Sequence, residues 1–395
     1  MAPYESDHAT GTGPDEDPRT GRRKAARYVV PVAVVGVAAA TIGLVPALAA
    51  SGDPDLPKIT AQQLVEKIAK SDVQRMSGTV KVSTDLGLPD LGSLQGGMGS
   101  DQGDSSADPR TKLTELASGT HTLRVAADGP EKQKVSLLER DAEYSLIHND
   151  KNVWGYDSAS NEVFHTTARH TGDKREHRPS ATPDDFAKEA LKSVDSTTSV
   201  TVDGTARIAG RDAYQLVIKP KQSGSTVRDV TIGVDAKTGL PLKFTLTPKS
   251  GGAPVLDAGF TKVSFAAPPA STFDFRPPKG AKVTEEKPGK DEHGPDFGGQ
   301  FAPGDLSGAD TIGEGWTTIA KFDTGAKGEK GDKADRQGGA MGGFLGSLGD
   351  QVSGDFGKGT VFSTRLVNAL ITDDGKVYAG AVTKDALVKA ADADK

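Results

Sequence analysis

The sequence contains no cysteine among its 395 residues. Disulfide bonds, thiol nucleophiles, zinc–thiolate sites and lipid attachment through a cysteine are therefore excluded. Hydrophobic residues make up only 35% of the chain and aromatic residues only 5%, whereas 48 residues are glycine. Because this apolar content is low for a chain that folds along its whole length, we expect one sizeable core and long segments that do not pack.

The chain also lacks an excess of basic over acidic residues. The chain has 48 Lys and Arg against 54 Asp and Glu, a net charge of −6, which gives no general electrostatic reason to bind nucleic acid. The sequence also has no Gly-x-Ser-x-Gly elbow, no phosphate-binding P-loop and no dinucleotide fingerprint. With no nucleophile–base pair to name, we expect no enzymatic activity and no cofactor.

The first 50 residues predict export from the cytoplasm. Residues 1–27 are polar and end in a basic flank, which predicts a disordered cytoplasmic tail. The uncharged run Tyr28–Ala50 has the length of a membrane span, and the basic flank before it places the N-terminus inside and the rest outside. Ala47-Leu48-Ala49 fits a signal-peptide cleavage site equally well. The sequence therefore predicts either a single-pass protein of the cell membrane or a secreted, extracytoplasmic protein.

The main folded domain is predicted at 59–283. Thr60 and Gln63 have capping-box spacing before a helix that ends near Ser71. A second helix, 183–194, follows Thr182, whose hydroxyl is suited to cap it.

Alternating apolar and polar residues predict antiparallel strands through most of this domain. They form a meander from 123 to 165 and a hairpin at 230–247, whose Asp-Ala-Lys-Thr-Gly loop supplies turn chemistry. A segment rich in Gly, Ser, Asp and Pro interrupts the pattern at 86–110, and we interpret it as a flexible insertion.

The remainder of the chain divides into a linker and a small module. Residues 284–310 are charged and rich in Pro and Gly, which is typical of a linker, and the two prolines before them are expected to stop any strand. Residues 311–395 predict a C-terminal β/α module with a low-complexity insertion at 323–358. Its ordered part is predicted as a strand over 360–372, a tight turn, a partner strand and a C-terminal helix.

Three motifs resemble the bacterial lipoprotein-carrier superfamily, which includes LolA, LolB and the N-terminal domain of RseB/MucB. They are Gly210-Arg-Asp-Ala-Tyr214-Gln-Leu, Val234-Asp-Ala-Lys-Thr-Gly-Leu-Pro-Leu242-Lys and Phe273-Asp-Phe-Arg-Pro-Pro-Lys-Gly-Ala281. The resemblance implies an α+β fold, in which an antiparallel, incompletely closed β-barrel (a half-barrel) holds helices in its concave face as a lid. It also implies an apolar cavity that holds lipid or the acyl chain of a lipoprotein.

The candidate cavity residues are the apolar members of the meander. They are Leu123, Val125, Val135, Leu137, Tyr144, Leu146, Trp154 and Tyr156. The alternative is that these residues are ordinary core packed on the two helices, because burial of apolar area favours both arrangements equally.

Two further hypotheses concern partners and metals. By analogy with RseB, the chain could instead be an envelope sensor that docks on an anti-sigma factor or another membrane protein through Trp316–Lys395. His165, His170 and His177 lie near Asp173 and Glu176, but their spacings match no metal-ligand motif in a loop full of Lys and Arg. We therefore expect a solvated loop and no metal site.

Overall fold

The structure, a computed structural model of the chain, describes residues 53–87, 105–109, 112, 115–116, 118–167, 182–192, 194–285, 310–323 and 349–394. The predicted tail 1–27, the apolar run Tyr28–Ala50 and nearly all of the linker lie outside these residues. Within the described ranges no helix is both long enough and apolar enough to cross a membrane. Apart from Asp53, the described residues belong to one unit, Pro54–Lys395.

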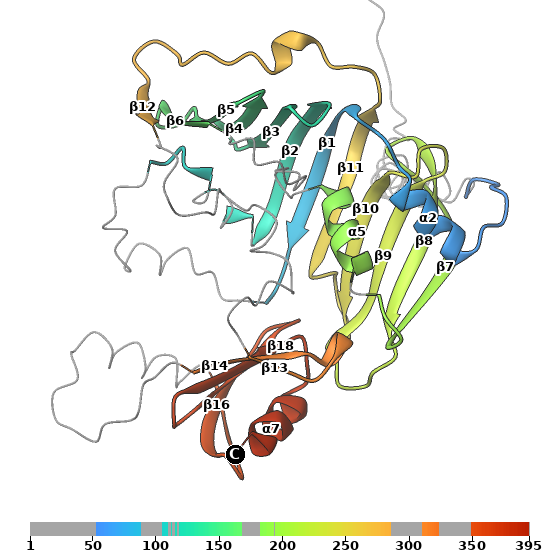
Figure 1. Cartoon of the computed structure of the whole chain (residues 1–395), viewed down its shortest axis with the longest axis vertical. Helices are drawn as coiled ribbons and strands as arrows, with labels where there is room; N and C mark the ends of the chain where they lie inside the picture. Colours follow the sequence, from blue (N-terminus) through green and yellow to red (C-terminus); the bar gives the residue numbers. More distant parts are fainter. Residues whose placement is uncertain are drawn as a thin grey trace, which may run out of the picture. The chain divides into compact units, whose positions relative to one another are not determined.

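A twelve-stranded sheet dominates the fold, in the order β12-β6-β5-β4-β3-β2-β1-β11-β10-β9-β8-β7 (Figure 1). All neighbours are antiparallel except β12 and β6. The strands are β1 Arg75–Thr84, β2 Gly119–Asp128, β3 Lys132–Leu138, β4 Glu143–Asn149, β5 Asn152–Asp157, β6 Glu162–Thr167, β7 Thr198–Ile208, β8 Arg211–Pro220, β9 Val227–Asp235, β10 Pro241–Pro248, β11 Leu256–Ser264 and β12 Lys282–Glu285. Of the predicted α+β half-barrel with helices as a lid, the coarser part, a large antiparallel sheet with helices, is confirmed, and the sheet stays open between its edge strands β12 and β7.

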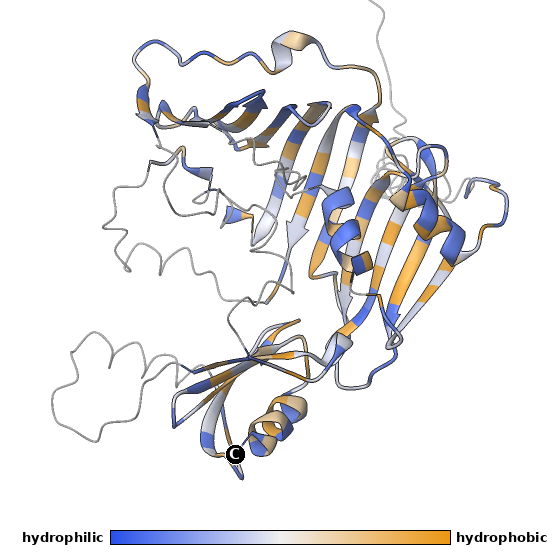
Figure 2. Cartoon of the chain, viewed as in Figure 1, coloured by the Kyte–Doolittle hydropathy of each residue, from blue (hydrophilic) through white to orange (hydrophobic). Residues whose placement is uncertain are grey.

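Two helices lie on the same face of this sheet, which we call the inner face; the opposite face is the outer face. The predicted capping box begins helix α2, Ala61–Ala69: the Gln63 amide donates to the Thr60 hydroxyl oxygen over 3.2 Å, and the Thr60 amide donates to the Gln63 side chain over 3.0 Å. Helix α5, Pro183–Lys192, follows Thr182 as predicted: the Thr182 hydroxyl oxygen accepts the Asp185 amide over 3.4 Å, and the Asp185 carboxylate accepts the Thr182 amide over 3.2 Å. Leu64 and Ile68, one turn apart, pack with Ala187 on the apolar residues of β8 to β10. Figure 2 shows these apolar positions as bands along the strands beside the helices.

The predicted hairpin is β9 and β10, and its loop packs against α2. The Asp235 carboxylate accepts the amides of Lys237 and Thr238 over 3.0 and 2.7 Å and pairs with Arg211. Desolvation opposes ionisation of Asp235, but the hydrogen bonds from Arg211 and Thr238 outweigh it and lower the pKa of that carboxyl. Gly239 has φ +77°, and a Cβ there would lie 2.4 Å from the carbonyl oxygen of Lys67. Glycine is therefore required by both the backbone and the neighbouring helix.

Strand β12 corrects the expectation that no strand follows Pro277-Pro278. Lys282–Glu285 pairs in parallel with β6, and side-chain contacts fix both ends: Lys282 pairs with Glu162 at 2.8 Å, and Glu285 is hydrogen-bonded to the His165 ring over 2.7 Å. A short 3-10 helix, η1 at Ala270–Thr272, precedes it on the path from β11. The prolines delay the strand by a few residues, because only the residues after them have free amides for pairing.

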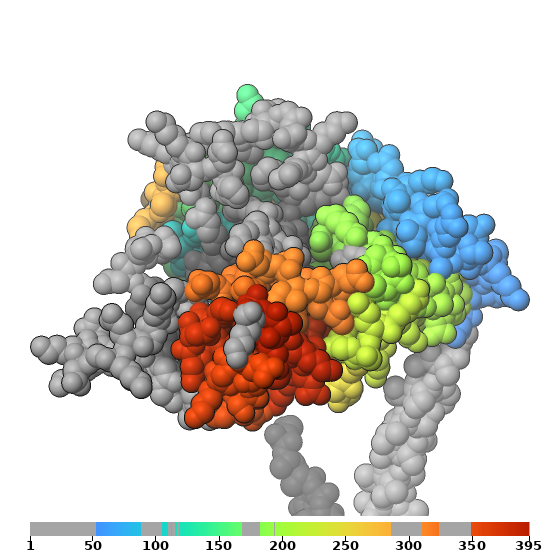
Figure 3. Space-filling model, turned by 60° about the horizontal axis from the view of Figure 1, so that its bottom comes forward, coloured from blue at the N-terminus to red at the C-terminus, as the bar shows by residue number. Residues whose placement is uncertain are grey.

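The C-terminal module is a six-stranded sheet in the order β13-β14-β18-β17-β16-β15, with one helix packed on it. Its elements are β13 Asp310–Ile312, η2 Gly315–Thr317, β14 Ile319–Asp323, β15 Asp350–Gly354, β16 Gly357–Ser363, β17 Asn368–Thr372, β18 Lys376–Gly380 and α7 Lys384–Ala393. Figure 3 shows the described residues of this module as one continuous body of atoms, drawn in orange and red.

Two sequence boundaries in the module were wrong. The end of the predicted low-complexity insertion forms β15, whose Val352 packs on the helix-covered core. The single strand predicted over 360–372 is two strands, because the Thr364 hydroxyl oxygen accepts the Val367 amide over 2.8 Å and reverses the chain.

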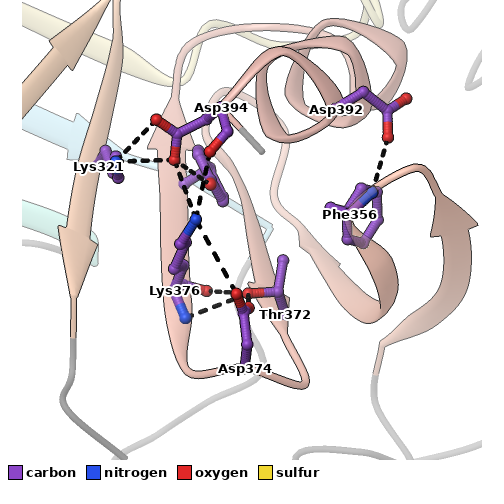
Figure 4. Close-up of polar contacts among 8 residues, drawn as sticks. Lys321, Phe356, Thr372, Asp374, Lys376, Asp392 and Asp394 are labelled. Atoms are coloured by element: carbon purple, nitrogen blue, oxygen red, sulfur yellow. Dashed lines mark hydrogen bonds and ion pairs between the residues drawn. The ribbon is translucent and has the colours of Figure 1, made fainter.

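A carboxylate at the end of α7 fastens the helix to the sheet (Figure 4). Asp394 pairs with Lys321 at 2.7 Å and Lys376 at 3.3 Å and accepts the Tyr378 hydroxyl over 2.8 Å. These contacts, led by that with Lys321, lower the pKa of Asp394 to about 2.

The hairpin gives a stability prediction. Gly239→Ala places a methyl group against Lys67 at positive φ, whereas Gly210→Ala also has φ +77° but meets nothing within 4 Å. Gly210→Ala should lower the free energy of unfolding by about 1–2 kcal/mol, the cost of the left-handed backbone. Gly239→Ala should cost at least about 1 kcal/mol more, because the methyl group also clashes. Urea unfolding of both variants measures the difference, and equal costs would contradict the packing argument.

Candidate functional site

The structure brings six of the eight predicted cavity residues together on the inner face. Leu123 is the Cα partner of Leu137, which is the partner of Tyr144. One row along, Val125 pairs with Val135, and Val135 with Leu146. All six are buried except Val135, which is half-buried. The alternation of apolar and polar residues in the sequence therefore corresponds to an apolar face formed by β2, β3 and β4.

The other two predicted residues, Trp154 and Tyr156, lie on the outer face, and their assignment to this group was wrong. The Cα partner of Leu146 is Gly155, so Trp154, one residue away, points to the opposite side. Trp154 stacks on His165 with 3.7 Å between ring centroids, and the rings of Trp154 and Tyr156 both contact Phe275. Trp154 and Tyr156 were expected on the inner face because they are large and apolar, whereas the partner of Leu146 on that face is a glycine.

The inner face extends further than the sequence analysis recognised. Val80 and Val82 of β1 continue it, with Ala258 and Phe260 of β11, into one buried cluster with the meander residues. Helices α2 and α5 cover the part formed by β8 to β10, where Phe186 of α5 contacts Phe244 with 5.5 Å between ring centroids. This extension could have been found from the alternation at Val80 and Val82 alone.

A short segment of the predicted insertion lies on the inner face over β4 to β6. We call this segment, residues 105–109, the strap. Ala107 is fully buried, and its carbonyl oxygen accepts the Tyr144 hydroxyl over 3.1 Å. A Cβ at Gly155 would lie 2.4 Å from that same carbonyl oxygen. The glycine in β5 thus permits the close approach of the strap, so the C-terminal end of the insertion is packed and not flexible as predicted.

Glu162 of β6 anchors the strap through its carboxylate. The carboxylate accepts the Ser105 hydroxyl and the Ser106 amide, both over 2.9 Å, while its other oxygen accepts from Lys282 over 2.8 Å. These hydrogen bonds, led by that from Lys282, lower the pKa of Glu162 to about 2. The anchor is therefore a charged group with several charge-assisted hydrogen bonds.

Tyr144 stays protonated and serves as a donor beneath the strap. Burial raises the pKa of its hydroxyl well above the ordinary value, and the charges of Asp108 and Asp157 raise it further. The hydroxyl therefore keeps its proton at neutral pH and can donate it to Ala107.

The chemistry of this face suits binding. Apolar side chains form its floor, and a five-residue strap, held by the Tyr144 hydroxyl and the Glu162 carboxylate, lies over its β4–β6 end. Removal of apolar surface from water is favourable by about 25 cal/mol per Å².

Comparison with known proteins gives likenesses of fold at low identity. No family model matches the sequence, and no curated protein matches it. An uncharacterized conserved protein from Thermus thermophilus has 14% identity and a TM-score of 0.32, covering 57% of this chain and 99% of its own. MucB of Pseudomonas aeruginosa in complex with MucA has 15% identity and a TM-score of 0.37, covering 84% and 96%. The LolA superfamily protein NE2245 from Nitrosomonas europaea has 12% identity and a TM-score of 0.21, covering 55% and 99%. MucB and NE2245 come from the groups that the three sequence motifs resemble.

The anchor gives a pH prediction. Because the pKa of Glu162 falls from its ordinary value of 4.5 to about 2 on folding, its contribution is complete above pH 4.5 and is lost as the pH falls through 2. The carboxyl ¹³C resonance of Glu162, followed by NMR, should still report the ionised form at pH 3. A midpoint near pH 4.5 would mean that the Lys282 and serine contacts do not hold in solution.

Proposed function

We propose that the chain is an extracytoplasmic protein that binds lipid, or the acyl chain of a lipoprotein, against the inner face of β1 to β6, without catalysis. The observation that carries this proposal is the difference in cover along one apolar face. Packed helices lie over β8 to β10, whereas a five-residue strap lies over β4 to β6. The motif resemblance to the lipoprotein carriers favours the same class of ligand.

The energetics favour exchange of the strap for an acyl chain. The strap is held at one end by charge-assisted hydrogen bonds to Glu162, each contributing about 1.5–3 kcal/mol. An acyl chain gains about 0.8 kcal/mol for each CH₂ group that it buries. A chain of ordinary length therefore offsets the loss of the anchor and uses the same apolar floor.

The location belongs to the same proposal. The uncharged run Tyr28–Ala50 directs the rest of the chain out of the cytoplasm, whether it is kept as a membrane anchor or removed as a signal peptide. A tethered form would present ligand at the membrane surface, and a cleaved form would carry it. Intact mass of the protein from native membranes distinguishes the two.

Ligand binding is tested by enlarging one inner-face residue. Val135→Phe fills space over the apolar floor and should weaken binding of a fluorescent fatty acid about tenfold or more. Glu162→Gln, which weakens the strap anchor, should instead strengthen binding of the same probe. Fluorescence titration of both variants measures the two opposite effects.

Leu138→Phe is the matched control, because Leu138 lies on the same strand as Val135 and points to the outer face. It should leave the titration unchanged. The proposal is wrong if no variant alters binding, or if protein purified from native membranes carries no lipid by mass spectrometry and binds no fatty acid.

A second candidate is an envelope sensor that docks on the extracytoplasmic part of an anti-sigma factor or another membrane protein. One observation favours it: Phe322 and Ile371 are 40% and 38% exposed. Both are Cα partners of Val377, so they share the sheet face opposite α7. An apolar strip of this kind suits an apolar segment of a partner protein.

The part of the C-terminal module that this candidate can use is narrower than Trp316–Lys395. The Trp316 indole donates to Thr198 over 2.8 Å, and its amide donates to Gln222 over 2.9 Å. Trp316 is therefore engaged by the chain's own β7 and by the connection between β8 and β9.

Partner capture tests the sensor. Phe322→Ser with Ile371→Ser should abolish pull-down of a membrane-protein partner by the full chain. Val194→Ser with Val283→Ser removes two equally exposed apolar side chains, 37% and 42% exposed, outside the module and should leave capture intact. Equal capture by both double variants would remove this candidate.

A further inference from the structure

A polar hollow lies on the outer face, away from the apolar site. Its volume is about 440 Å³, within the range of about 300–1,000 Å³ that is usual for small-molecule sites. Strands β11, β1, β2, β3 and β4 form its floor, and Thr272 of η1 contributes from the segment that crosses the outer face. It is lined by Ser77, Gly78, Thr79, Arg124, Val125, Ala126, Lys134, Ser136, Glu143, Lys262, Val263, Ser264 and Thr272.

Sheet register places three cationic side chains around this floor. Thr79 has Lys262 as its Cα partner on one side and Arg124 on the other. In the adjacent row, Ser77 lies between Ser264 and Ala126, and Ala126 is the partner of Lys134. Because neighbouring strands are about 4.8 Å apart, the two ammonium groups, the guanidinium and the hydroxyls can reach one ligand together.

The charges of the hollow do not cancel. Its lining has three cations and one carboxylate, Glu143, in a chain whose net charge is −6. Arg124 lies 3.6 Å from Glu143, whereas neither Lys134 nor Lys262 has an ion pair within 4.0 Å among the described residues. Two lysines therefore remain to balance the charge of a ligand.

Glu143 is occupied by its own neighbours. It accepts the Ser145 hydroxyl over 3.0 Å, and Ser145 pairs with Ser136 over 2.8 Å. Desolvation raises its pKa, but hydrogen bonds from Ser136 and Ser145 and the charges of Lys134 and Arg124 outweigh it, so the net pKa is lowered. The carboxylate is thus ionised and hydrogen-bonded to the serines; it attracts Lys134 and Arg124 by charge but forms no ion pair within 4.0 Å with either lysine among the described residues.

We propose that this outer hollow, with Arg124, Lys134 and Lys262 as its cations, binds a phosphate group, either as the free ion or on the headgroup of a lipid. Guanidinium and ammonium groups form charge-assisted hydrogen bonds to phosphate oxygens, and the hydroxyls of Ser77 and Thr79 can donate to the same oxygens. The site needs no apolar ligand and is separate from the inner face.

Calorimetric titration of the full chain in detergent tests the site with two probes, inorganic phosphate and dihexanoyl phosphatidylglycerol below its micelle concentration. The double variant Lys134→Ser with Lys262→Ser should weaken binding of whichever probe binds the unsubstituted chain about a hundredfold. This is roughly tenfold for each lysine that no longer donates a charge-assisted hydrogen bond. Higher ionic strength should weaken binding to the unsubstituted chain, because the hollow is open to solvent. Equal affinity for both probes would mean that the site recognises the phosphate group alone. Binding of the lipid alone would mean that the site recognises a lipid headgroup.

Lys219→Ser with Lys237→Ser is the control, because it removes the same net charge from two exposed lysines outside the hollow. It should leave both titrations within about twofold, since remote surface charges are screened. The proposal is overturned if neither probe binds, or if the hollow variant and the control lose affinity equally. Fatty-acid binding should be unchanged in the hollow variant, so failure of this site does not bear on the inner face.

Discussion

The constraint on which the rest of this fold depends is that one face of a twelve-stranded sheet has to be kept from water. The chain meets it with two kinds of cover. Helices α2 and α5 bury Leu64, Ile68 and Ala187 against β8 to β10, and this part is an ordinary core. Over β4 to β6 the cover is a strap held by hydrogen bonds to Tyr144 and Glu162. A polar anchor of this kind exchanges partners more readily than packed apolar side chains, which is why the proposed ligand is placed at this end of the face.

Sequence reasoning recovered the features that depend on local chemistry. The Thr60 capping box, the Thr182 cap and the Asp235 hairpin loop each satisfy their backbone groups within a few residues, so their residue types reveal them. The six inner-face residues of β2 to β4 followed from an alternation that the register preserves.

The features that sequence reasoning missed depend on distant partners. Trp154 was placed on the wrong face because a large aromatic residue is read as core, while the packing that makes Gly155 the inner residue comes from Ala107, far away in the chain. The strap lies in a segment of disorder-like composition, and contacts with distant residues, among them Glu162, Tyr144 and Ser160, give it a fixed place. Strand β12 follows two prolines and is held by Lys282 and Glu285, whose partners in β6 are 120 residues away.

Glu162 connects these distant features, because it faces the strap and strand β12 at once. Its carboxylate accepts hydrogen bonds from Ser105 and Ser106 through one oxygen and from Lys282 through the other. Without β12, β6 would be an open edge, and its unpaired backbone would be available to other chains. Without the strap, the apolar residues beside Gly155 would be open to water. One ionised side chain thus helps to close the edge of the sheet and to cover its inner face. Release of the strap by a ligand would still leave the Lys282 pair, so the edge can stay closed while the inner face opens.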